Sequence, residues 1–163
     1  MAAPGTVAGL VPFWLTGWRV EEPLLRASIL RVAGAVMACA GLVSLLDSFG
    51  RFVFVGRGTP APIAPPTRLV VSGQYRHVRN PMYVAVLALV IGQGLILGSG
   101  VLLRYAAFLW LLFHLFVVLY EEPRLGARFG ESYEVYRRNV GRWWPRIKPW
   151  AAATRSPPSA RGG

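Results

Sequence analysis

The sequence predicts an all-α integral membrane protein with three or four transmembrane helices, a helical hairpin and a C-terminal amphipathic cytoplasmic helix. Of its 163 residues, 54% are hydrophobic and only 15% are charged, and the apolar residues form long blocks. An ordinary soluble domain has fewer apolar and more charged residues. A helix needs about 20 predominantly apolar residues to cross a bilayer. Three segments come close to this length, at residues 24–46, 82–97 and 101–120.

The chain before the first predicted span has a short apolar stretch at residues 7–18. We expect either a tilted or truncated fourth span or an interfacial piece held by Trp14 and Trp18. A cleaved signal peptide is not expected, because no positive charge precedes the stretch and no small-residue cleavage site follows it. After the first span, the sequence TPAPIAPPT at residues 59–67 predicts a stiff, extended connector.

Two polar motifs flank the hairpin. GQYRHVRNPMY at residues 73–83 precedes it, and YEEP at residues 120–123 follows it. The apolar residues between the motifs are interrupted only by the sequence GSG at residues 98–100, which predicts a tight turn. Both motifs should therefore emerge on the same side of the membrane, with Pro81 in the first turn of the first hairpin helix. Ionisable residues that converge at a membrane face indicate a functional site.

Past the second motif, apolar residues recur at spacings of three and four, which predicts one amphipathic helix. They are Leu125, Phe129, Tyr133, Tyr136 and Val140. We expect this helix to lie at the cytoplasmic interface or to fold back over the polar cluster. Residues 1–150 should form a single domain, and residues 151–163 should be disordered because they have little to bury.

The net charge is +11, with 18 basic and 7 acidic side chains. Arginines lie before and after the hairpin but not in its turn, which by the positive-inside rule places residues 48–80 and everything after residue 120 in the cytoplasm. There they would contact anionic lipid. No aromatic-basic module or zinc-finger spacing accompanies the charge, so nucleic acid is not an expected partner. The single cysteine, Cys39, excludes an internal disulfide and a cysteine-based metal site, and no metal is expected.

The two motifs and the hairpin resemble the integral-membrane methyltransferases that include isoprenylcysteine carboxyl methyltransferases and phospholipid N-methyltransferases. The resemblance covers residues 67–147, and Asn80 to Tyr83 with YEEP look more like the phospholipid branch. It implies S-adenosylmethionine as the cofactor, bound at the cytoplasmic end of the helices, and a lipidic or membrane-soluble acceptor. The cofactor-binding positions that it implies are Leu69, Val70, Tyr75, Asn80, Pro81, Met82, Tyr83 and Glu121.

Two departures from this resemblance concern the acceptor. Isoprenylcysteine enzymes usually have histidine where this chain has Asn80, and an arginine for the substrate carboxylate where this chain has Val117. A carboxylate acceptor would therefore lack its counter-charge. A phospholipid amine, a thiol and a prenylcysteine-like carboxylate all stay open as acceptors.

The residues themselves suit a methyl donor. Methyl transfer from a sulfonium depends mainly on positioning, so no catalytic residue is assigned, and His77 and Arg79 are the candidates. Histidine is the most common general base in enzymes, which makes His77 a candidate for that role, and Arg79 or Arg76 would pair with the cofactor carboxylate. Glu121 would accept hydrogen bonds from the cofactor ammonium or ribose. Tyr75 and Tyr83 offer aromatic faces to the sulfonium.

Several of these residues also have a purely structural interpretation. In this interpretation, Arg76 and Arg79 only anchor the end of a span. Glu122 is expected to be a solvated helix-end charge, so Glu121→Gln should weaken cofactor binding much more than Glu122→Gln. His114 should make an interhelical hydrogen bond. The glycines at residues 92 and 94 indicate close helix packing and not a dinucleotide fingerprint.

Two other classes of protein stay open. One is an NADPH-dependent membrane reductase of sterol-reductase-like fold, which the supply of arginine does not exclude. The other is a non-catalytic membrane scaffold that binds anionic lipid. The abundance of Arg, Ala, Gly and Pro, with Lys148 as the only lysine, points to a bacterium and so to its inner membrane. The sequence leaves the acceptor, the oligomeric state and the organism open.

Overall fold

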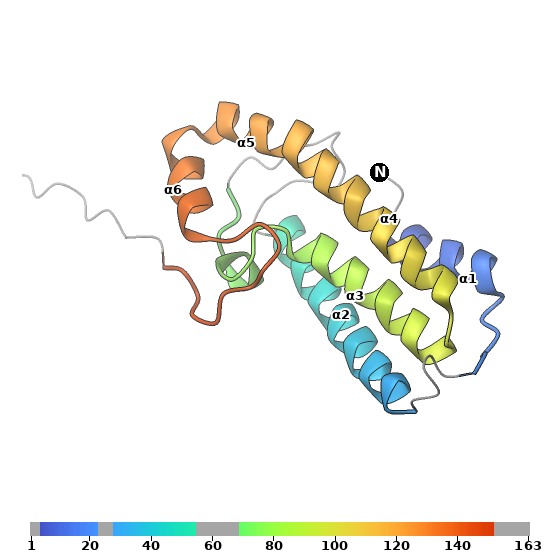
Figure 1. The fold of residues 1–163 in the computed structure, drawn as a ribbon. Helices are drawn as coiled ribbons and strands as arrows, with labels where there is room; N and C mark the ends of the chain where they lie inside the picture. Colours follow the sequence, from blue (N-terminus) through green and yellow to red (C-terminus); the bar gives the residue numbers. More distant parts are fainter. Residues whose placement is uncertain (1–3, 23–27, 55–68, 152–163) are drawn as a thin grey trace, which may run out of the picture.

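The computed structural model describes residues 4–22, 28–54 and 69–151. All regular secondary structure in these ranges is helical (Figure 1). The predicted all-α class is confirmed. The predicted connector at residues 59–67 and nearly all of the predicted disordered tail lie outside the described residues. The elements are η1 (Thr6–Leu10), α1 (Val11–Thr16), α2 (Ile29–Phe54), η3 (Gly73–Arg76), α3 (Pro81–Leu97), α4 (Gly100–Phe116), η4 (Val117–Glu121), α5 (Glu122–Phe129) and α6 (Glu131–Asn139).

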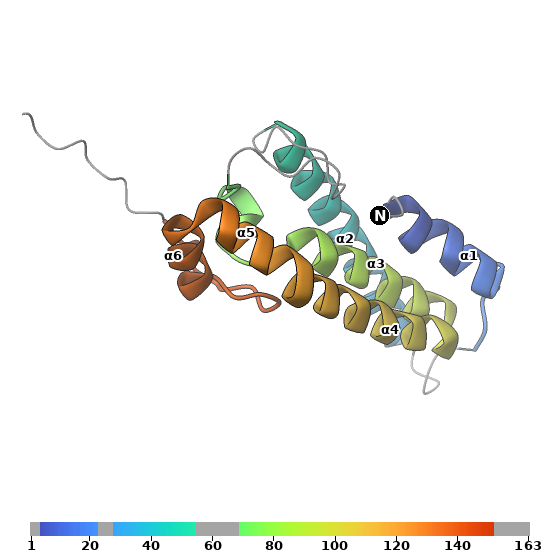
Figure 2. The ribbon, with the colours of Figure 1, turned by 90° about the horizontal axis from the view of Figure 1, so that it is seen from above.

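Within the described residues, two helical segments are long and apolar enough to cross a membrane, Ile29–Arg51 and Gly100–Phe129. Thr6–Thr16 and Pro81–Leu97 are apolar but shorter. The predicted spans thus correspond to α2, α3 and α4, of which α3 falls short of the usual spanning length. The third predicted span ends at residue 120, but the helix runs on through η4 into α5 without a break (Figure 2).

The predicted hairpin is confirmed. Gly98 adopts a left-handed conformation with φ of 74°, and its N–H donates to the carbonyl of Gly94. Residues other than glycine rarely adopt this backbone conformation, which ends α3 and reverses the chain. Consequently the start of α3 and the end of α4 point to the same end of the molecule, and the two polar motifs meet there (Figure 1).

α2 packs against α3 through glycines. A Cβ atom at Gly34 would lie 2.7 Å from the backbone oxygen of Gly92, and one at Gly92 would lie 2.7 Å from the oxygen of Gly34. The two backbones can approach this closely only because neither residue has a side chain. A Cβ atom at Gly94 would lie 2.9 Å from Leu103 of α4. The predicted role of Gly92 and Gly94 in close packing is confirmed.

The N-terminal helices rest on the hairpin. Gln93 Nε2 of α3 donates to the carbonyl of Ala8 at 2.7 Å, and the Tyr105 hydroxyl of α4 donates to the carbonyl of Val7 at 3.1 Å. Trp14 and Trp18 are exposed, as an interfacial segment requires.

The prediction of a single amphipathic helix after Pro123 is wrong in one respect. The helix breaks at Gly130, whose φ of 51° and ψ of −127° separate α5 from α6. The break turns α6 back toward η3, so that Tyr133, Tyr136 and Val140 form a buried cluster. Leu69 and Val71, which precede η3, pack against this cluster.

Candidate functional site

The polar end of the hairpin holds a small pocket of about 30 Å³, which has room for only a few water molecules. The two residues just before α3 contribute its walls together with η4, α5 and α6. The lining residues are Arg79, Asn80, Val117, Glu121, Glu122, Leu125, Tyr133 and Tyr136. The pocket therefore contains three of the predicted functional positions, Arg79, Asn80 and Glu121.

Glu121 is held by an aromatic side chain of α3. The Tyr83 hydroxyl donates to Glu121 Oε1 at 2.7 Å, and the Tyr83 ring packs on Phe113 with 4.7 Å between ring centroids. Burial, together with the charge of Glu121, raises the pKa of Tyr75, which stays neutral beside the carboxylate. Within the described part of the chain, no basic side chain forms an ion pair with Glu121. This half-buried carboxylate can therefore bind a cation.

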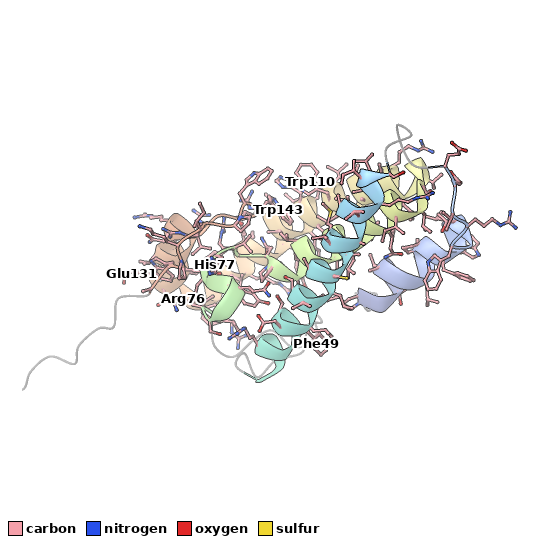
Figure 3. All side chains as sticks on the ribbon, turned by 90° about the horizontal axis from the view of Figure 1, so that it is seen from below. Phe49, Arg76, His77, Trp110, Glu131 and Trp143 are labelled. Atoms are coloured by element: carbon pink, nitrogen blue, oxygen red, sulfur yellow. The ribbon has the colours of Figure 1, made fainter. Side chains whose placement is uncertain are left out.

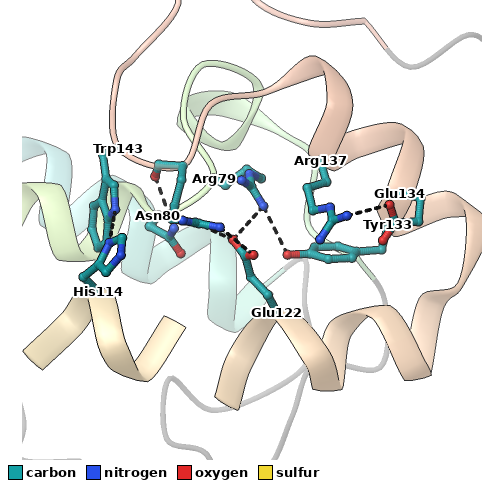
Figure 4. Close-up of polar contacts among 9 residues, drawn as sticks. Arg79, Asn80, His114, Glu122, Tyr133, Glu134, Arg137 and Trp143 are labelled. Atoms are coloured by element: carbon teal, nitrogen blue, oxygen red, sulfur yellow. Dashed lines mark hydrogen bonds and ion pairs between the residues drawn. The ribbon is translucent and has the colours of Figure 1, made fainter. Parts of the chain in front are cut away.

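Glu122 is only 8% exposed, so the prediction that it is a solvated charge is wrong. Arg79 Nη1 donates to Glu122 Oε1 at 2.9 Å. Arg142 binds the same carboxylate with two donors, Nε to Oε1 at 2.7 Å and Nη2 to Oε2 at 2.8 Å (Figure 4). A bidentate contact between a guanidinium and a carboxylate is among the strongest side-chain interactions. Glu122 thus joins the hairpin to the chain beyond α6.

Arg79 was expected to bind a cofactor carboxylate, but its partners are Glu122 and the Tyr133 hydroxyl, the latter at 3.3 Å. Its Nε atom is buried, and no hydrogen-bond partner for it occurs among the described residues. Asn80 Nδ2 donates to the carbonyl of Arg142 at 3.2 Å. The motif therefore binds the C-terminal segment as well as lining the pocket.

The arginine and histidine earlier in this motif contact the C-terminal segment and do not line the pocket. Arg76 Nε donates to the carbonyl of Trp150 at 2.6 Å, and His77 Nδ1 lies 2.8 Å from the carbonyl of Arg146. The structure therefore does not bring His77 together with Glu121. These contacts favour the anchoring interpretation of Arg76.

His114 accepts a hydrogen bond at Nδ1 from Trp143 Nε1 at 3.1 Å (Figure 4). Its ring also stacks on Trp110. An interhelical bond to another span was expected. The observed partner lies instead in the chain after α6. The prediction of a hydrogen-bonding role is correct, but the predicted partner on another span is wrong.

The remaining predicted cofactor positions surround the pocket without lining it. Val70 and Pro81 are buried, whereas Leu69 and Met82 are half-buried. The Tyr136 hydroxyl donates to the carbonyl of Tyr75 at 2.6 Å, and burial raises the pKa of Tyr136, which keeps this donor protonated. These contacts fix the loop before α3 against α6.

Sequence reasoning missed Arg142, Tyr133 and Tyr136 as site residues. Arg142 was one of many basic residues after the hairpin, and the two tyrosines read only as an apolar helix face. A signal was nevertheless available. A glutamate next to a long apolar span needs a cationic partner if it is buried, and Glu122 is such a residue.

A profile of the family described as phospholipid methyltransferase matches residues 29–132, from the start of α2 to the start of α6. The chain is also 38% identical over 73 residues to a protein of Schizosaccharomyces pombe named protein-S-isoprenylcysteine O-methyltransferase. That match covers 44% of this chain and 30% of the yeast protein, so the chain corresponds to less than a third of this relative. No solved structure shows a significant match.

Proposed function

Because the chain belongs to the phospholipid methyltransferase family, a family of membrane enzymes, we propose that it transfers a methyl group from S-adenosylmethionine to a lipidic acceptor. The observation that carries the proposal is Glu121. This carboxylate is half-buried, is held by the Tyr83 hydroxyl and forms no ion pair within the described residues. An uncompensated carboxylate of this kind fits a cationic cofactor.

The chemistry of the residues present fits this cofactor, although the described pocket of about 30 Å³ is smaller than the cofactor and has to widen to admit it. It supplies an electrophilic methyl carbon on a positively charged sulfur. Glu121 would accept charge-assisted hydrogen bonds from the cofactor ammonium or ribose hydroxyls. Tyr83 would orient the carboxylate, and the ring of Tyr75 would face positive charge. The buried Nε of Arg79 is a donor available to the cofactor carboxylate. The protein's contribution is then mainly positioning and exclusion of water.

An NADPH-dependent reductase is less well supported. Such a site needs basic side chains for phosphate groups. Arg79, which lines the pocket, and Arg142 both bind Glu122, which leaves the buried Nε of Arg79 as a single donor, enough for one carboxylate oxygen but not for several phosphate groups. Glu121 beside them would repel phosphate. The arrangement therefore favours a cationic ligand over an anionic one.

The pocket wall bears on the acceptor. Val117 is 1% exposed and lines the pocket, at the position where a carboxylate acceptor would need a positive charge. An apolar wall supports an amine or thiol acceptor carried by a lipid, and we propose that class. His77 contacts the carbonyl of Arg146 outside the pocket, so it is not proposed as the general base.

We propose that α2, α3 and α4 span the membrane, with Thr6–Thr16 at an interface. The distribution of arginine supports a site on the cytoplasmic side. The composition supports a bacterial inner membrane. The acceptor would then reach the pocket from within the bilayer.

Two measurements on detergent-purified protein test the proposal. We expect S-adenosylhomocysteine to bind and NADPH not to bind. A lipid extract incubated with the protein and trideuteromethyl-labelled cofactor should yield a lipid whose mass increases by one labelled methyl group. Binding of NADPH alone would indicate a reductase, and binding of neither ligand would indicate a scaffold; each result would contradict the proposal.

A further inference from the structure

The segment after α6, residues 141–150, is held firmly although it has no helix. We call it the return loop. The N–H of Arg79 donates to the carbonyl of Gly141 at 2.9 Å, and the N–H of Arg146 donates to the carbonyl of His77 at 3.0 Å. The N–H of Trp150 donates to the carbonyl of Arg76 at 2.9 Å. These bonds run from one end of the loop to the other, so its shape is fixed by the residues before α3.

The first part of the return loop runs along α4, away from the polar end of the hairpin, and the loop then returns to the residues before α3. Its Trp143 hydrogen-bonds to His114, and Figure 3 shows Trp143 next to Trp110. His114 precedes Glu121 by seven residues on one continuous helix. At 1.5 Å per residue, His114 lies roughly 10 Å closer to the middle of the predicted span than Glu121 does. The loop therefore reaches the depth of the apolar part of α4.

Two apolar side chains beyond Trp143 are exposed. Trp144 is 86% exposed and Ile147 is 96% exposed. In a loop whose backbone is hydrogen-bonded at both ends, these side chains cannot simply rotate inward to a core. Trp110 on the adjoining part of α4 is also exposed. Exposed apolar side chains thus lie both on the loop and on the part of α4 that Trp143 contacts.

Basic side chains alternate with these apolar ones. Arg146 and Lys148 are both exposed. One Arg146 nitrogen donates to the carbonyl of Asn139, and its side chain remains accessible. Tryptophan next to basic residues is typical of segments at a membrane interface, where each lysine or arginine near an anionic leaflet contributes about 1 kcal/mol.

We propose that the return loop is an interfacial anchor for anionic phospholipid. Trp144 and Ile147 enter the boundary between headgroups and acyl chains, and Arg146 and Lys148 bind the phosphate-bearing headgroups. Because the loop also carries Arg142, lipid contact holds the arginine that binds Glu122 beside the pocket. The inference depends on membrane insertion and not on the identity of the cofactor.

The anchor can be tested with a fluorescent label at residue 147. The full chain carries Cys39→Ser, since Cys39 is the only cysteine, and Ile147→Cys is labelled with an environment-sensitive fluorophore. Glu131→Cys, at an exposed position at the start of α6, is the matched control, and Trp144→Cys serves as a second anchor position in case Ile147→Cys fails to fold. Each variant is reconstituted in phosphatidylcholine vesicles with or without phosphatidylglycerol, together with a lipid that carries a quencher.

We expect lipid quenching at residue 147 to exceed that at residue 131 by at least about threefold, because interfacial segments lie about 5–10 Å below the headgroup surface. Phosphatidylglycerol should increase this quenching, and Arg146→Gln with Lys148→Gln should abolish the increase. Quenching equal to that of the control would overturn the anchor. Quenching independent of phosphatidylglycerol would overturn the assignment to anionic lipid. Protection from both lipid-borne and water-soluble quenchers would indicate a protein contact and would also overturn it.

Discussion

Glu121 and Glu122 are adjacent, yet they lie in opposite electrostatic environments. Successive helical residues point about 100° apart, so Glu121 faces Tyr83 while Glu122 faces Arg79 and Arg142. Glu122 is neutralised within the protein. Glu121 is not neutralised by any described residue, which makes it the side chain available to a positively charged ligand.

Glu122→Gln should destabilise the protein. Glutamine leaves two arginines without an anionic partner, of which Arg79 has a side chain only 10% exposed. We expect a loss of about 2–4 kcal/mol in the free energy of unfolding. Thermal unfolding in detergent measures this loss. The matched control is Glu134→Gln, whose carboxylate pairs with Arg137 at the surface and should contribute less than about 1 kcal/mol. Equal stabilities would show that the buried cluster is not an important structural contact.

Tyr83→Phe tests how the carboxylate of Glu121 is held. The variant keeps the ring on Phe113 but loses the hydrogen bond to Glu121. We expect S-adenosylhomocysteine to bind up to about tenfold more weakly, the equivalent of one hydrogen bond of about 1.4 kcal/mol. Tyr105→Phe removes a hydroxyl that contacts the N-terminal helix and should leave affinity unchanged. Unchanged affinity in Tyr83→Phe would show that Glu121 needs no such support.

At the scale of the elements, the contact between α2 and α3 depends on glycines, which have no side chain, at positions 34 and 92. Gly92→Ala should destabilise the protein by about 1–3 kcal/mol, as overpacking usually does, because the new methyl group would lie 2.7 Å from the carbonyl oxygen of Gly34. Gly50→Ala is the control, since a Cβ atom at this α2 position meets nothing within 4 Å. Alanine there should stabilise the helix slightly. The unfolding temperatures of the two variants should therefore move in opposite directions, and a shift in the same direction would contradict the packing described here.

The hairpin was predictable because its signals are local. Apolar blocks, the sequence GSG and two polar motifs all lie within one continuous stretch. The break at Gly130 was not predicted, because a glycine within an amphipathic pattern is compatible with an unbroken helix. The pairing of Arg142 with Glu122 could not be inferred either. It depends on the return of the chain after that break, and several other arginines near the site had the same charge.

At the scale of the whole molecule, the charge distribution predicts one topology. Val101→Cys, at the hairpin turn, should react only with a probe applied from the side opposite the cytoplasm. Arg138→Cys on α6 should react only from the cytoplasmic side. Both positions are exposed, whereas Ser99 is 2% exposed and would be a poor probe. With Cys39→Ser as background, labelling of intact cells or sealed vesicles measures the topology. The reverse pattern would invert the proposed orientation.

The central claim is that Glu121 binds a cationic methyl donor, and calorimetric titration of S-adenosylhomocysteine tests it most directly. Loss of one charge-assisted hydrogen bond should weaken binding to Glu121→Gln by roughly tenfold to a hundredfold. Glu131→Gln, an exposed carboxylate on α6, should bind like the parent, provided that all proteins elute alike on size exclusion. Equal affinity for Glu121→Gln and the parent, or no binding to the parent, would contradict the claim.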